Sequence, residues 1–293
     1  MTNGPGDARI ETWNRDGLAL RYRDYWRNAD GPPLLCLHGL TRNSRDFEAF
    51  AQHYAGRFRV VAPDFRGRGL SNWDPEPSRY NPATYAADVL ALLDELAIEQ
   101  AIFVGTSLGG LVTMVVAAIQ PERIAGAILN DVGPELDERG LNRIRGYLGR
   151  QQRFATWRQA GEYVARINGN LPDHFGQAEW IERARKTCRE RDGSIMLDYD
   201  MAIAEPFQSP PDTPATDMWP LFHSLAGKPL LILRGERSDL LSPASLARMA
   251  AVSSTVSAAT VAGVGHAPDL TEPEAIAAID AFLRQFRTAD SVG

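Results

Sequence analysis

The stretch that decides the fold is Ala101-Ile-Phe-Val-Gly-Thr-Ser-Leu-Gly-Gly-Leu-Val-Thr-Met-Val-Val-Ala-Ala-Ile119. Residues 101–104 form a short apolar run with β-branched side chains, which predicts a buried strand. Residues 108–119 are rich in Ala, Val and Met and end at Gln120-Pro121, which predicts a buried helix. The intervening Gly105-Thr-Ser-Leu-Gly109 matches G-x-S-x-G. Because this motif requires a strand before it and a helix after it, we interpret Ser107 as the nucleophile of a strand–turn–helix elbow.

The composition is that of an ordinary globular protein, with 293 residues of which 44% are hydrophobic and 23% charged. The net charge of −6 gives no indication of nucleic acid or an anionic membrane surface as a partner. No signal peptide and no apolar run of about 18 residues is found. The two cysteines, Cys36 and Cys188, fit a reducing compartment. We therefore expect a cytoplasmic protein, and nothing in the sequence decides its oligomeric state.

Strand and helix patterns alternate along most of the chain, which predicts a mostly parallel sheet with helices on both faces. The division that we expect is a core of residues 1–131 and 226–293, with a helical cap at 132–225. In the cap, apolar runs shorten and arginines become frequent. The expected strands cover 9–13, 18–25 (a hairpin turning at Asp16-Gly17), 33–37, 58–62, 101–104, 124–129, 229–233 and 257–261. The expected helices cover 43–54, 82–96, 108–119, 141–154, 157–167, 179–191, 242–252 and 273–286.

A serine hydroxyl becomes a nucleophile when an imidazole removes its proton, and the imidazole needs a carboxylate to fix its tautomer. His266 follows the last predicted strand in a Gly-rich loop, so we predict it as the base. Asp239 follows the penultimate strand and is our first choice for the acid, in the chain order Ser, Asp, His. Glu236 in the same loop and Asp131, at the end of the strand after the elbow, remain alternatives.

The tetrahedral intermediate of acyl transfer needs two hydrogen-bond donors for its oxyanion. The backbone amide of Leu108, directly after the nucleophile, is one candidate. The second is the amide of Leu40, in the loop after the 33–37 strand. His38 in that loop is expected to hold backbone geometry rather than act as a base. Arg66 or Arg68 is a candidate for bracing the site.

No cofactor or metal is expected from the sequence. His53, His174 and His223 are scattered and show no metal-ligand spacing. The glycines of Arg66-Gly-Arg-Gly69 lack the G-x-G-x-x-G pattern and the following helix that a dinucleotide site needs.

Taken together, these motifs resemble the α/β-hydrolase superfamily over about residues 26–131 and 226–287. The resemblance implies a mostly parallel, eight-stranded α/β-hydrolase sheet with helices on both faces and an inserted helical cap. The stretches that carry it are His38-Gly39, Asp64-Phe-Arg-Gly-Arg-Gly-Leu-Ser71, Gly105-Thr-Ser-Leu-Gly-Gly110, Gly235-Glu-Arg-Ser-Asp239 and Gly265-His266.

Several branches of this superfamily can be compared with the chain. Haloalkane dehalogenases and epoxide hydrolases use an aspartate nucleophile, whereas position 107 is serine. The C–C bond hydrolases of meta-cleavage pathways typically carry a tryptophan directly after the histidine, where this chain has Ala267. Cofactor-free haloperoxidases and perhydrolases share the triad. We therefore expect a serine hydrolase, a carboxylesterase or lactonase, that cleaves a small-molecule ester or lactone through an acyl-enzyme. The alternatives are C–C hydrolysis of a diketone and a non-catalytic receptor for a small ligand.

The cap is expected to cover the site and to select the substrate. Residues 139–158 contain six arginines and no acidic residue, which favours a solvated helix face over a rim that steers anions. At most two or three of the aromatic residues named below are expected to line an apolar pocket, and the others to anchor cap helices. These aromatic residues are Tyr147, Phe154, Trp157, Tyr163, Trp180, Tyr199 and Trp219.

Overall fold

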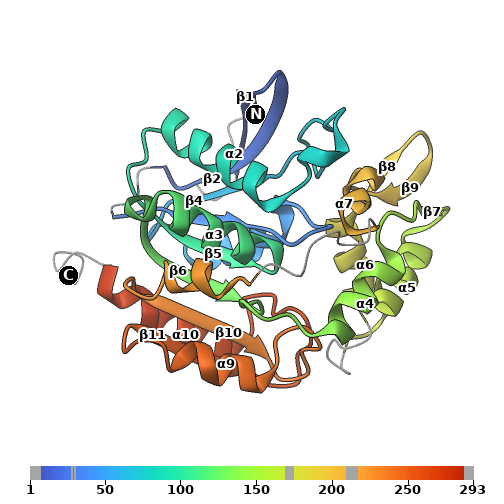
Figure 1. Ribbon diagram of the computed structural model, residues 1–293. Coiled ribbons are helices and arrows are strands. Elements are labelled where there is room, and N and C mark those ends of the chain that lie inside the picture. Colours follow the sequence, from blue (N-terminus) through green and yellow to red (C-terminus); the bar gives the residue numbers. More distant parts are fainter. Residues whose placement is uncertain (1–7, 28, 30, 169–174, 209–216, 287–293) are drawn as a thin grey trace.

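A computed structural model describes residues 8–27, 29, 31–168, 175–208 and 217–286. Its centre is an eight-stranded sheet in the order β1-β2-β4-β3-β5-β6-β10-β11 (Figure 1). Neighbours from β4 to β11 are parallel, and β2 is antiparallel to β1 and β4, so the predicted sheet is confirmed. The strands are β1 (Arg9–Arg15), β2 (Leu18–Tyr25), β3 (Leu34–Leu37), β4 (Val60–Asp64), β5 (Ala101–Thr106), β6 (Ile124–Asn130), β10 (Leu230–Gly235) and β11 (Val256–Val261).

The central strands are buried on both faces, which explains their continuous apolar runs. In β5, Ala101 and Phe103 face one hydrophobic cluster, and Ile102 and Val104 face the other. The first cluster includes side chains of α2, α3, α8 and α9, and the second includes side chains of α1 and α10. The core helices are α1 (Glu48–His53), α2 (Pro82–Glu95), α3 (Leu108–Ile119), α9 (Pro243–Ala250) and α10 (Pro273–Leu283).

Local sequence signals set several element boundaries. The β1–β2 hairpin turns at Asp16-Gly17, whose φ angles of 53° and 79° are the left-handed values of a two-residue hairpin turn. Asn81 accepts a hydrogen bond from the Thr84 amide (2.9 Å) and caps α2, with Pro82 in the first turn. The hairpin turn and the start of α2 at residue 82 agree with the sequence prediction.

Most elements of the segment between β6 and β10, from α4 to α7, form a separate group beside the sheet (Figure 1). Helices α5 and α6 pack against each other, and three short strands pair in the order β7-β9-β8. Helix α8, near the end of the segment, packs against α3 of the core. The elements are α4 (Glu138–Tyr147), β7 (Arg153–Phe154), α5 (Trp157–Ile167), α6 (Gln177–Thr187), β8 (Cys188–Arg191), β9 (Ser194–Leu197), α7 (Glu205–Gln208) and α8 (Trp219–His223).

Two helix predictions in this segment were wrong at their ends. The helix expected at 179–191 ends at Thr187, and the chain continues as β8, which pairs with β9 through a turn at Asp192-Gly193. Both turn residues have positive φ, 51° and 70°, as at Asp16-Gly17. The Asp-Gly dipeptide was therefore the overlooked signal. The helix expected at 141–154 stops at Tyr147, before β7.

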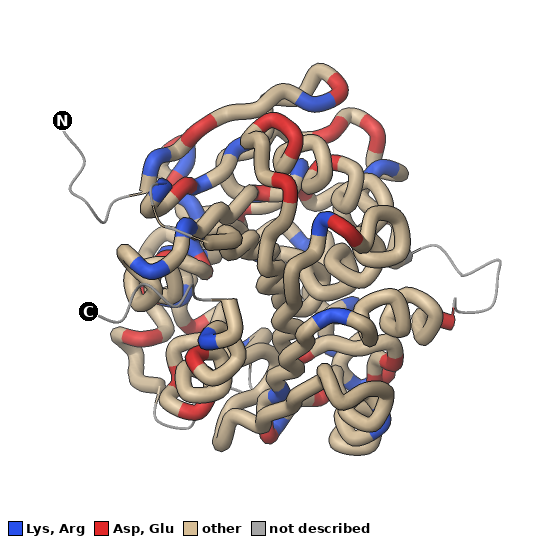
Figure 2. Tube along the Cα trace, turned by 90° about the vertical axis from the view of Figure 1, so that its left-hand side faces the viewer, with Lys and Arg blue, Asp and Glu red and all other residues tan. Residues whose placement is uncertain are grey.

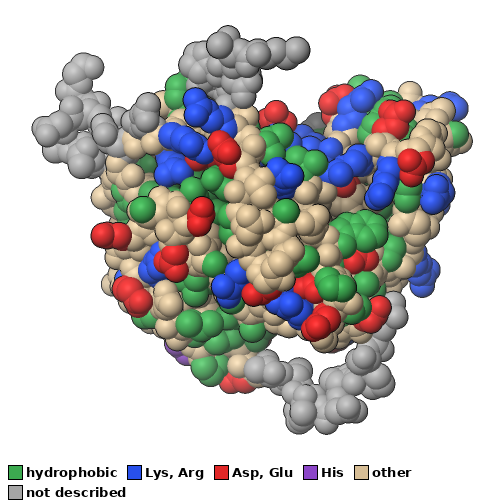
Figure 3. Space-filling view, turned by 90° about the horizontal axis from the view of Figure 1, so that it is seen from above, with side chains coloured by type: hydrophobic (Ala, Val, Ile, Leu, Met, Phe, Trp, Pro, Cys, Tyr) green, Lys and Arg blue, Asp and Glu red, His purple; other side chains and the backbone are tan. Residues whose placement is uncertain are grey.

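Acidic and basic residues are intermixed along the trace and over the face seen from above, so no large patch of one sign forms on that face (Figures 2 and 3). No helix in the described part of the chain is long and apolar enough to cross a membrane.

Close packing of α3 on β3 depends on Gly109, because a Cβ there would lie 2.0 Å from the Leu37 carbonyl oxygen. We expect Gly109→Ala to lower the free energy of unfolding by about 3 kcal/mol or more, or to prevent folding. The matched control is Gly146→Ala, at an exposed position in α4 with no atom within 4 Å of the added methyl group. The control should be neutral or stabilising by up to about 1 kcal/mol. Urea unfolding followed by tryptophan fluorescence checks both, and equal stabilities would contradict the packing argument.

Candidate active site

Ser107 lies on the turn between β5 and α3, as the motif predicts. Its φ of 52° and ψ of −114° are unusual for a residue with a side chain and match the strained elbow of such nucleophiles. A Cβ at Gly105 would lie 2.5 Å from the Gly109 carbonyl carbon, so the first glycine of the motif is required by contact across the turn. Ser107 is the N-cap residue of α3 and so lies at the positive end of the helix dipole.

Three side chains form a continuous hydrogen-bonded chain at this edge of the sheet. The Nε2 atom of His266 lies 3.0 Å from Ser107 Oγ, and its Nδ1 atom lies 2.7 Å from Asp131 Oδ2. With the Nδ1 proton donated to the carboxylate, Nε2 is left to accept the serine proton. The predicted pairing of Ser107 with His266 is thus present in the structure.

Asp131, directly after β6, is the carboxylate that contacts the histidine. It is completely buried, and it also accepts hydrogen bonds from the Gly235 amide (2.9 Å) and the Ser238 hydroxyl (2.6 Å). Its own amide donates to the Leu233 carbonyl (2.8 Å). These contacts hold the carboxylate in one orientation toward Nδ1.

The preference for Asp239 as the histidine's partner was wrong in this structure. Its carboxylate instead forms a two-point ion pair with Arg143 of α4, at 2.6 and 2.9 Å. Partial burial raises the pKa of Asp239, but the hydrogen bonds and charge of Arg143 outweigh this effect and lower the pKa below its ordinary value. Glu236 is exposed and accepts from the Gly263 amide (2.7 Å), so it does not reach the histidine either.

Sequence position alone could not decide whether Asp131 or Asp239 contacts the histidine, because β6 and β10 are adjacent parallel strands. Their carboxyl ends meet at the same edge of the sheet, and both loops start near the histidine. The folded β10 loop decides the outcome, since it turns Ser238 toward Asp131 and leaves Asp239 against the cap.

The two residues predicted to supply the oxyanion donors, Leu40 and Leu108, both lie close to Ser107. Leu108 is the first residue of α3, and the first amides of a helix have no carbonyl partner within it. On the other side, a Cβ at Gly39 would lie 3.8 Å from the Ser107 Cβ, so the loop carrying Leu40 approaches the nucleophile. This placement supports the prediction that the amides of Leu40 and Leu108 bind the oxyanion.

The loop with Leu40 is held by two buried side chains. His38 accepts a hydrogen bond from the Phe65 amide at Nε2 (3.1 Å) and contacts the Gly39 carbonyl at Nδ1 (2.7 Å). Burial lowers the pKa of His38 to about 4, so the ring is neutral and both nitrogens serve structure, as expected. Arg68 donates from Nε to the Leu40 carbonyl (2.9 Å).

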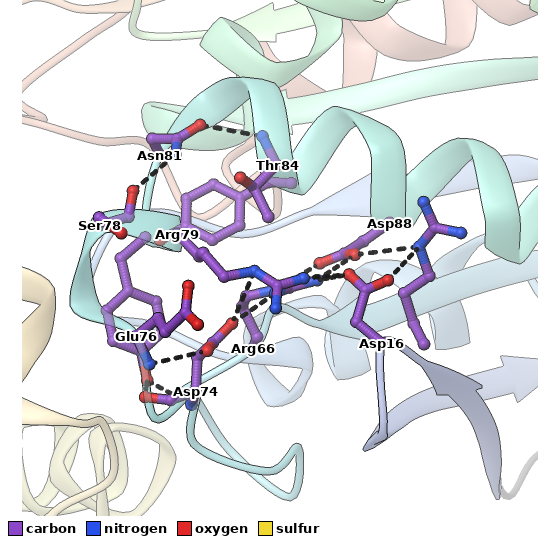
Figure 4. A network of polar contacts seen from close by, with 12 residues as sticks. Asp16, Arg66, Asp74, Glu76, Ser78, Arg79, Asn81, Thr84 and Asp88 are labelled. Carbon is purple, nitrogen blue, oxygen red and sulfur yellow. Dashed lines mark hydrogen bonds and ion pairs between the residues drawn. The ribbon is translucent and has the colours of Figure 1, made fainter.

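Arg66, two residues before Arg68, lies in a network of polar contacts with several carboxylates (Figure 4). Its buried guanidinium pairs with Asp88 (2.5 and 2.8 Å), Asp74 (2.5 Å) and Asp16 (3.2 Å). Burial alone lowers the pKa of Arg66, but the hydrogen bonds and charges of these carboxylates raise it above the ordinary value. The Arg66 carbonyl accepts from Arg68 Nη1 (2.8 Å), which links this network to the oxyanion loop.

A cavity opens between the core and the cap above Ser107 and His266. Of the seven cap aromatic residues named from the sequence, all of them described, Tyr147 alone is among the lining residues, which agrees with the expected maximum of two or three. Phe154 and Tyr163, for example, pack on each other inside the cap. The remaining cap side chains in the lining are largely polar, namely Arg143, Ile144, Ile167, Asn168, Arg183 and Thr187.

Within the described residues, no three His, Cys, Asp or Glu side chains gather in a way that could hold a metal ion. His53 and His223 lie apart from the cavity lining, and His174 lies outside the described residues.

The arrangement matches a known family. Residues 34–279 match the model of the alpha/beta hydrolase family. The chain belongs to this family. As an α/β-hydrolase, it is 35% identical over 292 residues to a 3-hydroxybutyrate-oligomer hydrolase of Cupriavidus necator, covering 97% of this chain and 99% of that protein. It is 30% identical to a 2-(acetamidomethylene)succinate hydrolase of Mesorhizobium japonicum over 83% and 84% of the two chains.

A solved structure extends the similarity to the whole fold. The crystal structure of an α/β-hydrolase from Novosphingobium aromaticivorans superposes with a TM-score of 0.90 at 46% identity, covering 95% of this chain and 99% of that one. The crystal structure of E-2-(acetamidomethylene)succinate hydrolase superposes with a TM-score of 0.77 at 26% identity, over 94% and 98% of the chains.

The geometry predicts which carboxylate activates the serine of this α/β-hydrolase. A fluorophosphonate probe should label the wild type at Ser107, and Asp131→Asn should slow labelling by about 10³- to 10⁴-fold, because the histidine loses its tautomer partner. Asp239→Asn is the isosteric control and should label within a few-fold of the wild type. Slow labelling of the Asp239 variant with normal labelling of the Asp131 variant would reverse the assignment.

The buried neutral His38 predicts acid sensitivity. An unfolded histidine takes up a proton near pH 6.5, whereas folded His38 does so only near pH 4. The unfolded state therefore binds more protons as the pH falls through this window, and stability present above pH 6.5 is lost toward pH 4. This residue alone should lower the free energy of unfolding by about 2 kcal/mol between pH 7 and pH 4.5. Urea unfolding at both pH values measures this loss of stability. The loss should be smaller by that amount in His38→Gln than in the wild type, and equal losses in the two proteins would contradict the prediction.

Proposed function

We propose that the protein is a serine hydrolase that cleaves a carboxylic ester or lactone of a small molecule through an acyl-enzyme. The observation that carries this proposal is the hydrogen-bonded chain from Asp131 through His266 to Ser107 Oγ, which borders the cavity beneath the cap. This chain supplies a general base for the hydroxyl and a fixed tautomer for the base.

In the proposed reaction, Ser107 Oγ attacks the ester carbonyl carbon while His266 Nε2 takes the hydroxyl proton. The amides of Leu40 and Leu108 hold the oxyanion of the tetrahedral intermediate. As the intermediate collapses, the imidazolium returns the proton to the leaving alcohol oxygen and the acyl-enzyme remains. Water, activated by the same imidazole, then attacks the acyl carbon and releases the acid.

Esters of short hydroxy acids are the substrates to examine first. The support is the relative named 3-hydroxybutyrate-oligomer hydrolase, whose similarity extends over nearly the full length of both chains. Such an oligomer combines an ester bond with a free carboxylate at one end. The position after His266 is Ala267, which differs from the tryptophan typical of the C–C hydrolase branch.

The proposal predicts turnover of p-nitrophenyl butyrate and of the ester-linked dimer of 3-hydroxybutyrate. Ser107→Ala should lower kcat for both by at least about 10⁴-fold, because the residual rate comes only from binding and the oxyanion hole. Release of p-nitrophenol and of the 3-hydroxybutyrate monomer measures the two reactions. If both activities are absent and a coloured meta-cleavage diketone is cleaved instead, the proposal of ester hydrolysis is wrong and C–C hydrolysis takes its place.

A further inference from the structure

The cavity beside the nucleophile is lined by three guanidinium groups within the described residues, those of Arg42, Arg143 and Arg183. Two of them are held edge-on by a carboxylate. Arg42 donates from Nε and Nη2 to the two oxygens of Asp46 (2.8 and 2.5 Å), and Arg143 donates from the same two atoms to Asp239. A carboxylate that binds through this edge makes the strongest type of arginine contact, so these two groups are already satisfied.

Arg183, on α6, is different. Its ion pair with Asp269 uses only Nη1, which contacts both carboxylate oxygens at 2.8 and 2.6 Å. Its Nε atom is buried and has no hydrogen-bond partner in the part of the chain that the structure describes. A buried donor without a partner is unfavourable, and such a group in a native structure calls for an explanation, of which a bound water or ligand is one.

The two partners of this pair differ in exposure. The Arg183 side chain is 12% exposed, whereas that of Asp269 is 43% exposed and lies three residues beyond His266. Both side chains line the cavity, so a carboxylate that enters it meets the Arg183–Asp269 pair directly, and the more exposed Asp269 is the partner that it can displace. A carboxylate entering the cavity could then take the place of Asp269 at the Arg183 guanidinium.

We propose that Arg183 binds the free carboxylate of the substrate and so selects esters of hydroxy acids that end in a carboxylate over neutral esters. This inference rests on the proposed ester hydrolysis and adds the substrate's charge and the residue that recognises it. The alternative role is a structural latch, in which the Arg183–Asp269 pair fastens α6 of the cap to the loop after His266.

Binding in the absence of turnover separates the inference from the proposed function. The ligands are the 3-hydroxybutyrate dimer and its terminal primary amide, which has the same shape without the charge, titrated calorimetrically into Ser107→Ala at pH 7.5. We expect the acid to bind at least tenfold more tightly than the amide, as charge-assisted hydrogen bonds provide. Adding Arg183→Gln should weaken the binding of the acid and leave that of the amide unchanged, so that the two ligands bind with equal affinity.

The control for net charge is Arg185→Gln in the same Ser107→Ala background. Arg185 lies on the same helix, half exposed and outside the cavity lining, so this change should keep the preference for the acid. Equal binding of acid and amide to Ser107→Ala, or failure to bind either, overturns the inference. Hydrolysis of p-nitrophenyl butyrate by the wild type tests the proposed ester hydrolysis independently. That proposal therefore remains supported if the ester is cleaved but the binding experiment shows no preference for the carboxylate.

Asp269→Asn distinguishes carboxylate recognition from the latch. If Arg183 binds substrate, removing its competing carboxylate should leave acid binding unchanged or tighten it severalfold, the opposite of Arg183→Gln. If the pair is a latch, both variants should weaken acid and amide alike, and that outcome overturns the proposal.

Discussion

The buried carboxylate of Asp131 is the interaction on which the arrangement of the active site depends. It lies directly after β6 and accepts hydrogen bonds from the Gly235 amide, the Ser238 hydroxyl and His266 Nδ1. Three loops that follow neighbouring parallel strands therefore converge on one group. A fully buried carboxylate is strongly destabilising unless its oxygens are paired, so the need to satisfy Asp131 also fixes the position of the histidine.

The opposite side of the nucleophile is organised by buried cations. Arg68 binds the carbonyl of Leu40, and its neighbour Arg66 is neutralised by three carboxylates from separate parts of the chain. His38 remains neutral because burial lowers its pKa. Backbone oxyanion donors work when they are already oriented before the reaction, and these side chains orient the loop without contacting the reacting atoms.

The cap gives the cavity a polar character that its aromatic content did not suggest. Most of its aromatic rings pack within the cap or against the core, whereas guanidinium groups from α4 and α6 reach the cavity. Among the described residues, two of the three cavity arginines are neutralised through Nε and Nη2 by aspartates, and Arg183 is only partly engaged. An unevenly neutralised group of this kind favours an anionic substrate and ties specificity to the inserted segment rather than to the core.

The sequence by itself determined the α/β core, the elbow serine and the histidine, because each is marked by a local pattern. A strand, a Gly-framed serine and a helix can be read within residues 101–119, and the histidine is framed by glycine after the last strand. Only the tertiary structure decided between Asp131 and Asp239, since two adjacent parallel strands bring both carboxylates to the same edge. The same holds for Arg183 and the aromatic residues of the cap, because which side chains face the cavity depends on how helices pack. The β8–β9 hairpin lies between these cases: its Asp192-Gly193 signal is local, but the preceding helical pattern obscured it.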